Sequence, residues 1–203
     1  MPCEMTDAIF DRQVRLFGTE TQERIGGTTV VVAGRANKIS AEIVKNVVLL
    51  GVYEVRTTEE IALEAERLIK GDLGTINERV KINRKLRNDS IGRMGHGYGI
   101  VGRLLDYFRG ESKNDKSSLF YFLIDQDHSG LDVGYYFVCS GCRTAVKNSC
   151  VHQCIRKEGA GVDNRMLELA KDLYVGATVV QEFIKIVDGK PETAAATFSA
   201  DGL

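Results

Sequence analysis

Residues 28–52, TTVVVAGRANKISAEIVKNVVLLGV, decide the fold class of this 203-residue chain. The stretch opens with the apolar run VVVA at 30–33, turns at Gly34, and continues with apolar residues at helical spacing between 43 and 48. Strand, turn and helix in this order form the opening unit of a dinucleotide-type α/β sheet, whose phosphate site lies in the turn. Beyond Gly34, however, the turn GRANKIS lacks the glycines that such a phosphate site needs.

The segments around this stretch extend the α/β pattern. Residues 7–24 are predicted to form one helix, which the glycine pair at 26–27 ends. The helix after Gly34 is expected to begin near Ser40 and to end at Gly51. A short strand over 53–56 should lie beside the first strand, with a right-handed crossover between them.

Further along the chain, Thr57 and Glu60 form a capping-box pattern for another helix. The apolar runs LFYFLI and VGYYFVC are typical of buried strands. Helices are also predicted over about 75–87 and over 143–157. Two last helices should follow, one with inward residues between Met166 and Leu173 and the other with inward residues between Val180 and Val187. Residues 88–118 have the least regular pattern. Without a repeat or linker, 1–203 is expected to be a single domain with a mostly parallel, Rossmann-like sheet.

Composition excludes several classes of function. The net charge of −1 offers no general attraction to nucleic acid or to an anionic membrane. No apolar run approaches the roughly 20 residues that a transmembrane helix needs, and the acidic start MPCEMTDAIFDRQ does not resemble a secretory signal. The five cysteines are clustered, which suits a reducing compartment. The chain is therefore expected in the cytoplasm or the nucleus.

The sequence GYGIVG, from Gly97 to Gly102, matches the dinucleotide-binding fingerprint. A helix-like segment follows it, and a strand that ends in Asp125 comes at a suitable distance. The strand that should precede the fingerprint is missing, because KLRNDSIGRMGH is polar and basic. A flexible glycine-rich loop explains the same residues more simply. A nicotinamide site is kept as the alternative.

Two further patterns suggest metal sites. The sequence DQDHSG from Asp125 begins like a calcium loop, but Tyr136 stands at the twelfth position, where a glutamate is required. A polar turn between two strands is the simpler interpretation. The cysteines within 139–154 could hold zinc, with Cys139 and Cys142 as a C-x-x-C pair followed by Cys150 and Cys154. Small buried thiols explain that pattern as well, and we expect no metal in this chain.

Residues 10–18, FDRQVRLFG, resemble the amino-terminal signature of the ubiquitin-like-protein-activating enzymes, which share a ThiF-like adenylation fold. The likeness continues in further segments: 20–34, 41–52, 66–86, 135–159 and 175–190. Within the family, the sequence is most similar to the smaller, regulatory subunit of the SUMO-activating heterodimer, and then to its NEDD-type counterpart. The resemblance implies that a homologous partner chain binds ATP and Mg²⁺ and adenylates the modifier, while this chain completes the fold.

All departures from the family pattern argue against a nucleotide-binding site in this chain. Thr57 stands where the resemblance places the acid that binds ribose, and Asn77 or Glu78 stands near the position of a phosphate-binding lysine. Cys139 and Ser140 replace the magnesium aspartate. The resemblance therefore implies no cofactor here.

Arg12, in the motif FDRQ, is the one residue that matches the family's active site. The resemblance implies that it reaches across the heterodimer to the partner's ATP, where a guanidinium can neutralise charge on the α-phosphoryl group. Arg15 is expected to support that helix or the interface. The sequence thus predicts a subunit of a ligase-type adenylating enzyme that is not catalytic alone. A nicotinamide-dependent oxidoreductase and an interaction module remain the alternatives.

Overall fold

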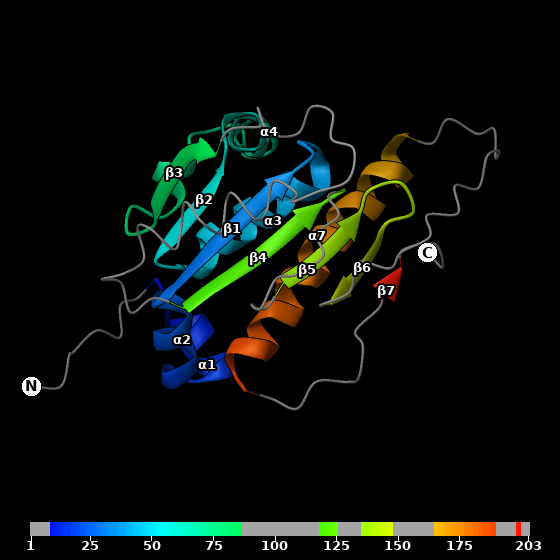
Figure 1. Cartoon of the computed structure of the whole chain (residues 1–203). Coiled ribbons are helices and arrows are strands. Elements are labelled where there is room, and N and C mark those ends of the chain that lie inside the picture. Colours follow the sequence, from blue (N-terminus) through cyan, green and yellow to red (C-terminus); the bar gives the residue numbers. More distant parts are fainter. Residues whose placement is uncertain (1–8, 87–117, 126–134, 148–164, 190–197, 200–203) are drawn as a thin grey trace, which may run out of the picture.

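The computed structural model describes residues 9–86, 118–125, 135–147, 165–189 and 198–199. Their strands form one sheet in the order β3-β2-β1-β4-β5-β6-β7 (Figure 1). β3, β2, β1, β4 and β5 pair in parallel, and β6 and β7 continue the sheet antiparallel. The strands are β1 (Thr28–Gly34), β2 (Glu54–Thr58), β3 (Lys81–Leu86), β4 (Ser118–Ile124), β5 (Tyr135–Cys139), β6 (Thr144–Lys147) and β7 (Phe198–Ser199).

Three helices lie side by side on one face of the sheet, with α3 between α4 and α7 (Figure 1). α3 and α7 cross closely at Gly176. A Cβ on this residue would lie 2.7 Å from the Cβ of Glu42, so the glycine allows the close approach. Within the described ranges, no helix combines the length and apolarity needed to cross a membrane. The helices are α1 (Asp11–Phe17), α2 (Thr19–Gly26), α3 (Lys38–Leu50), α4 (Glu59–Ile69), α5 (Leu73–Ile76) and α7 (Arg165–Val187).

The core lies between β1, β4 and this helical layer. All seven residues of β1 are buried, as expected for a central parallel strand. Aromatic rings of β4 and α7 meet beside it, with the centroids of Phe120 and Phe183 4.9 Å apart. Contacts of this kind add stability beyond the buried apolar area. The structure therefore confirms the predicted α/β fold with a mostly parallel sheet.

The predicted helix over 7–24 is wrong as a single element. The structure divides it into α1 and α2 at Gly18, whose φ of 90° and ψ of 160° no helix can contain. α3 begins at Lys38 rather than near Ser40, because Asn37 is its N-cap. α4 likewise takes its cap from Thr58, whose hydroxyl accepts a hydrogen bond from the Ile61 amide, and not from Thr57.

The other differences concern segments with charged sequences or nonlocal pairing. The predicted helix over 75–87 is wrong: α5 ends at Ile76, and residues 81–86 form β3, whose backbone pairs with β2. Residues 144–147 of the predicted helix 143–157 form β6, and 148–157 lie outside the described residues. The two last helices are one continuous α7, and its Met166, expected to point inward, is 76% exposed. Residues 88–117 also lie outside the described part.

Candidate functional site

The carboxyl edge of the sheet is the first place to look for a ligand. The strand order reverses between β1 and β4, and α/β sheets bind ligands outside the carboxyl ends of the strands at such a switch point. Gly34 ends β1 at this edge, Asp125 directly follows β4, and Ser140 directly follows β5. These are the positions from which a nucleotide would be held.

Gly34 is needed here for packing between strands. A Cβ at this residue would lie 2.0 Å from the carbonyl oxygen of Ile124, and its φ of +108° disfavours any other residue. The close approach of β4 thus explains the glycine without a ligand.

Three backbone amides at the β1–α3 turn and the start of α3 are already used within the chain. The Arg35 amide donates to the Ile124 carbonyl oxygen at 3.0 Å. The Asn37 amide donates to Ser40 Oγ at 2.9 Å, and the Ser40 amide donates to Asn37 Oδ1 at 3.0 Å. A phosphate cradle depends on free N–H groups at the helix start. This reciprocal capping box offers its own side chains in place of a phosphate.

The charged side chains around the turn are also occupied. Arg35 Nη1 lies 3.7 Å from Asp125 Oδ2, and Asp125 Oδ1 accepts a hydrogen bond from the Ser140 amide at 2.7 Å. Lys38 Nζ is 2.6 Å from Glu64 Oε1. The hydrogen bond from Lys38 lowers the pKa of the Glu64 carboxyl, which therefore stays charged and holds the lysine. Both cations therefore have a carboxylate partner within the chain.

Thr57 and Asn77, which the resemblance placed at nucleotide-binding positions, have structural contacts instead. Thr57 is fully buried, and its hydroxyl donates to the Val32 carbonyl oxygen at 3.0 Å. Asn77 is buried as well, and its Nδ2 donates to the Val48 carbonyl oxygen at 3.1 Å. Glu78 beside it is exposed. Cys139 is buried at the end of β5. Thr57 and Asn77 thus bond to the backbone of the fold, as side chains with a structural role do.

Arg12 lies at the opposite edge of the sheet, on α1. Its side chain is exposed, and among the described residues it has no hydrogen bond or ion pair. The neighbouring Arg15 differs, because its Nη2 lies 2.9 Å from Asp11 Oδ2 one helical turn earlier. The expectation that Arg15 supports this helix agrees with that ion pair. Of the two arginines on α1, Arg12 is thus the one without a carboxylate partner among the described residues.

The carboxyl end of α3 holds α1 and α2 in place. Gln13 Nε2 donates to the Leu49 carbonyl oxygen at 3.0 Å, and Gln22 Nε2 donates to the Leu50 carbonyl oxygen at 2.9 Å. These two side chains satisfy carbonyl groups that a helix end leaves without partners. The segment that carries Arg12 is therefore anchored to the opening unit of the fold.

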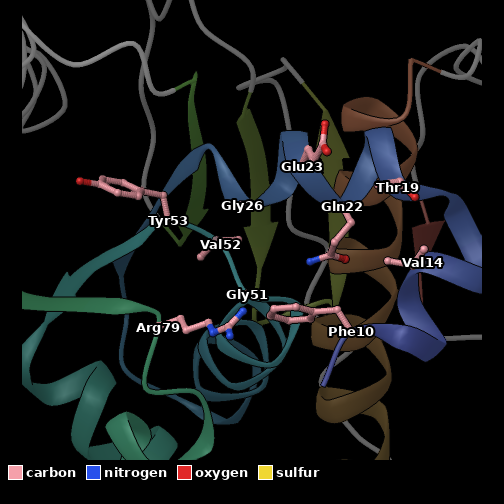
Figure 2. A pocket seen from close by; sticks show the side chains of 10 residues that line it. All are labelled: Phe10, Val14, Thr19, Gln22, Glu23, Gly26, Gly51, Val52, Tyr53 and Arg79. Atoms are coloured by element: carbon pink, nitrogen blue, oxygen red, sulfur yellow. The ribbon is translucent and has the colours of Figure 1, made fainter. Parts of the chain in front are cut away.

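The ring of Phe10 strengthens this anchor (Figure 2). It lies on Gly51, the left-handed C-cap of α3, with the Arg79 guanidinium carbon 6.0 Å from its centroid. A cavity of about 400 Å³ opens beside the ring. Its lining includes Val14, Gln22, Glu23, Val52 and Tyr53.

The length of α3 separates the two edges. With 13 residues at about 1.5 Å each, the turn at its start lies roughly 20 Å from the C-cap that holds α1. This distance exceeds the reach of an arginine side chain. Arg12 therefore cannot serve an anion at the carboxyl edge of its own chain.

Several predicted sites lie outside the described residues. They include the fingerprint from Gly97 to Gly102, most of the calcium-like loop, and Cys150 with Cys154. Neither Cys139 nor Cys142 forms a disulfide with a described residue. In the part of the chain that the structure describes, no group of three His, Cys, Asp or Glu side chains is placed to hold a metal. The zinc and nicotinamide hypotheses stay predictions.

Sequence reasoning missed two parts of this arrangement. The Asn37–Ser40 box could have been found, because a cap residue followed three positions later by a second polar residue is a known signature. The contact of Phe10 with Gly51 and Arg79 had no local signal, since its members come from three distant segments.

Comparison with known proteins gives one sequence relative and several structural ones. No protein-family model matches the sequence. Over 61 residues, 30% of the chain, it is 34% identical to SUMO-activating enzyme subunit aos-1 of Caenorhabditis elegans, and the match spans only 18% of that protein. E. coli MccB has a similar structure, with a TM-score of 0.55 at 10% identity over 97% of this chain and 70% of MccB.

Two more solved structures agree with this likeness. E. coli MccB with ATP matches 98% of this chain and 73% of its own, with a TM-score of 0.53 at 10% identity. The match with PaaA covers 95% of this chain and 82% of PaaA, with a TM-score of 0.51 at 9% identity. The chain therefore has the same fold as MccB and PaaA, which confirms the ThiF-like fold that the resemblance implied.

Proposed function

We propose that this chain is the non-catalytic, regulatory subunit of a heterodimeric, ATP-dependent enzyme that activates a ubiquitin-like modifier, most closely of the SUMO type. Its fold and its short similarity to a SUMO-activating enzyme subunit support this function. The capping box at the start of α3 supports a non-catalytic role, because a phosphate bound to the Asn37 and Ser40 amides would have to displace it.

The position of Arg12 is the observation that carries the proposal. An exposed arginine without an ion pair among the described residues stands at the amino edge, about 20 Å by helix length from the carboxyl edge. An anion that it serves must therefore belong to another chain. In the proposed heterodimer that anion is the ATP of a homologous catalytic chain.

Arg12 contributes electrostatic stabilisation in this mechanism. Adenylation builds negative charge as pyrophosphate leaves the α-phosphoryl group, and a fixed guanidinium offsets that charge without reorganising solvent. Anchoring of α1 by Gln13 and Phe10 keeps the guanidinium on a rigid support. ATP and Mg²⁺ are held by the partner in this scheme, and the complex works in the nucleus or the cytoplasm.

Calorimetric titration of the isolated chain with ATP and Mg²⁺ tests the non-catalytic part of the proposal. We expect no heat of binding, and robust binding would overturn it. Modifier specificity is tested by supplying a SUMO-type or a NEDD-type modifier with its matching catalytic chain. ATP–pyrophosphate exchange should require the SUMO-type pair, whereas exchange with the NEDD-type pair alone would reassign the modifier.

A further inference from the structure

β3 lies at one edge of the described sheet, with β2 on its inner side and no described strand on its outer side (Figure 1). The Lys81 amide donates to the Tyr53 carbonyl oxygen at 3.2 Å, on the β2 side. Because the backbone groups of alternate residues point to opposite sides of a strand, Ile82 and Arg84 direct their N–H and C=O groups outward. No described residue bonds to these outward groups. A strand edge of this kind can pair with another extended chain.

The side chains of β3 divide between the two faces of the sheet. On the face that carries α4, Arg84 Nη1 lies 3.3 Å from Glu66 Oε2. Lys81 and Lys85 project from the opposite face, since side chains alternate along a strand. The side chain of Lys81 is 66% exposed, and Lys85 is exposed without an ion pair among the described residues. We call the outward backbone groups of Ile82 and Arg84, together with these two lysines, the β3 edge.

From this arrangement we infer that the β3 edge binds an extended peptide by strand addition, and that this peptide carries acidic side chains at alternate positions. The backbone of an added strand would pair with the outward groups of Ile82 and Arg84. Its acidic side chains would lie beside Lys81 and Lys85. The β3 edge is separate from Arg12, so this inference goes beyond the proposed function and does not depend on it.

The charge on the lysine face favours an acidic peptide. Lys81 Nζ lies 3.5 Å from Glu54 Oε1, but Glu54 also binds Arg56, with 2.8 Å between Oε2 and Nη2. One carboxylate shared by two cations offsets only part of their charge. Lys85 adds a cation that no described carboxylate offsets. Acidic residues of an added strand would therefore meet positive charge on this face.

The face that carries α4 selects uncharged residues at the positions in between. Carboxylates surround Arg84 there, from Glu59, Glu66 and Asp72. A further acidic side chain on this face would meet like charge. Ile82, partly buried against the core, offers an apolar neighbour instead. The expected peptide thus alternates acidic and apolar residues, with the period of two that a strand imposes.

A second copy of β3 is a poorer partner than an acidic peptide. Pairing two β3 edges would place Lys81 and Lys85 of one copy beside the lysines of the other. Like charges next to each other destabilise a strand pair. Lysines on an edge strand are a common means by which proteins prevent pairing with their own copies. Charge therefore favours a different, acidic chain.

The β3 edge is also held in place before binding. Arg84 ties β3 to α4 through Glu66, and the backbone of β3 pairs with β2 from Lys81 onward. A preorganised surface loses less conformational entropy on association. We therefore expect the edge to act as a ready template for an incoming strand.

Fluorescence anisotropy with the full chain and a labelled synthetic peptide of alternating Asp and Val tests the inference. We expect saturable binding, and no binding of the same peptide with Lys in place of Asp. Lys85→Glu should raise the Kd for the Asp–Val peptide by about 10-fold, because it puts like charges together in place of opposite ones. Lys171→Glu makes the same change of charge on α7, which α3 separates from α4. This control should leave the Kd unchanged.

A second peptide separates strand addition from attraction between charges. It has the same Asp and Val side chains, but its backbone nitrogens are methylated and cannot donate hydrogen bonds. It should not bind, and binding as tight as that of the parent peptide would overturn strand addition.

Three other results would also contradict the inference. The parent peptide could fail to bind the wild type, or Lys85→Glu could bind it equally well. Sedimentation of the wild type could show self-association that Lys85→Glu changes and Lys171→Glu does not, which would identify a second copy as the occupant. The assays contain neither ATP nor a modifier, so these results leave the proposed function standing.

Discussion

The ring of Phe10 lies on Gly51 so closely that a Cβ at position 51 would come within 2.4 Å of the ring carbon Cζ. Gly51 is also the C-cap of α3 and has a φ of 78°. The helix that in related folds offers its N-terminus to a phosphate thus uses its other end to seat the segment with Arg12. The start of α3 therefore has a structural role, through its capping box. Its end at Gly51 supports the proposed function, because it holds the segment with Arg12.

Gly51→Ala should destabilise the protein by more than about 1 kcal/mol, because alanine is strained at this φ and its methyl group would displace Phe10. Urea denaturation followed by circular dichroism measures the change. Gly71→Ala is the control, since nothing lies within 4 Å of a Cβ at that position. Equal stability of the two variants would show that Phe10 is not seated on Gly51.

Asn37→Ala should lower the free energy of unfolding by about 1 kcal/mol, because it removes the side-chain cap of α3. Asn37→Asp keeps an acceptor for the Ser40 amide and places a negative charge at the helix N-terminus, so it should retain most of the stability. The same denaturation measurement applies. A loss as large in Asn37→Asp as in Asn37→Ala would contradict the capping role.

The ion pair between Lys38 and Glu64 predicts a pH dependence. The hydrogen bond from Lys38 lowers the pKa of Glu64 in the folded protein. The contribution of this ion pair to the free energy of unfolding is therefore fully present above the pKa of Glu64 in the unfolded chain. It is lost as the pH falls through the lower pKa of Glu64 in the folded protein. Wild type should exceed Glu64→Gln in unfolding free energy at pH 7 by less than about 1 kcal/mol, because the pair is partly exposed to solvent. The difference should shrink as the pH falls below the unfolded pKa of about 4.3 and vanish below the lowered pKa of Glu64 in the folded protein.

Glu78→Gln provides the control for this pH series. Glu78 is exposed, and among the described residues it forms no ion pair. The difference in unfolding free energy between Glu78→Gln and wild type should stay constant from pH 7 into the acid range. A Glu64→Gln difference that is equally flat, or that grows in acid, would show that Lys38 does not hold this carboxylate.

How much of the fold the sequence predicts depends on where each element finds its partners. β1 and α3 carry continuous apolar patterns, so their local sequence is sufficient, and all of β1 is buried as expected. β3 reads KINRKL, a charged segment at one edge of the described sheet, and its backbone becomes a strand by pairing with β2. Such nonlocal pairing leaves no period in the sequence.

The candidate site divides in the same way. Arg12 was identified only through a motif resemblance, because an exposed arginine has no pattern of its own. The bulky residues of the β1–α3 turn were enough to predict that it does not bind phosphate. The contacts that Arg35 makes there could not be predicted, because Ile124 and Asp125 lie far along the chain. The anchoring of α1 at Gly51 likewise required the folded chain.

ATP–pyrophosphate exchange with Arg12→Ala tests the central claim most directly. The assay combines the variant, at concentrations that saturate binding, with the ATP-binding large chain and its modifier. Removing a group that stabilises transition-state charge should lower the maximal rate by about 100-fold or more. Arg15→Ala, at the arginine paired with Asp11, is the neighbouring control and should stay close to wild type. An Arg12→Ala rate equal to that of the wild type would contradict the account.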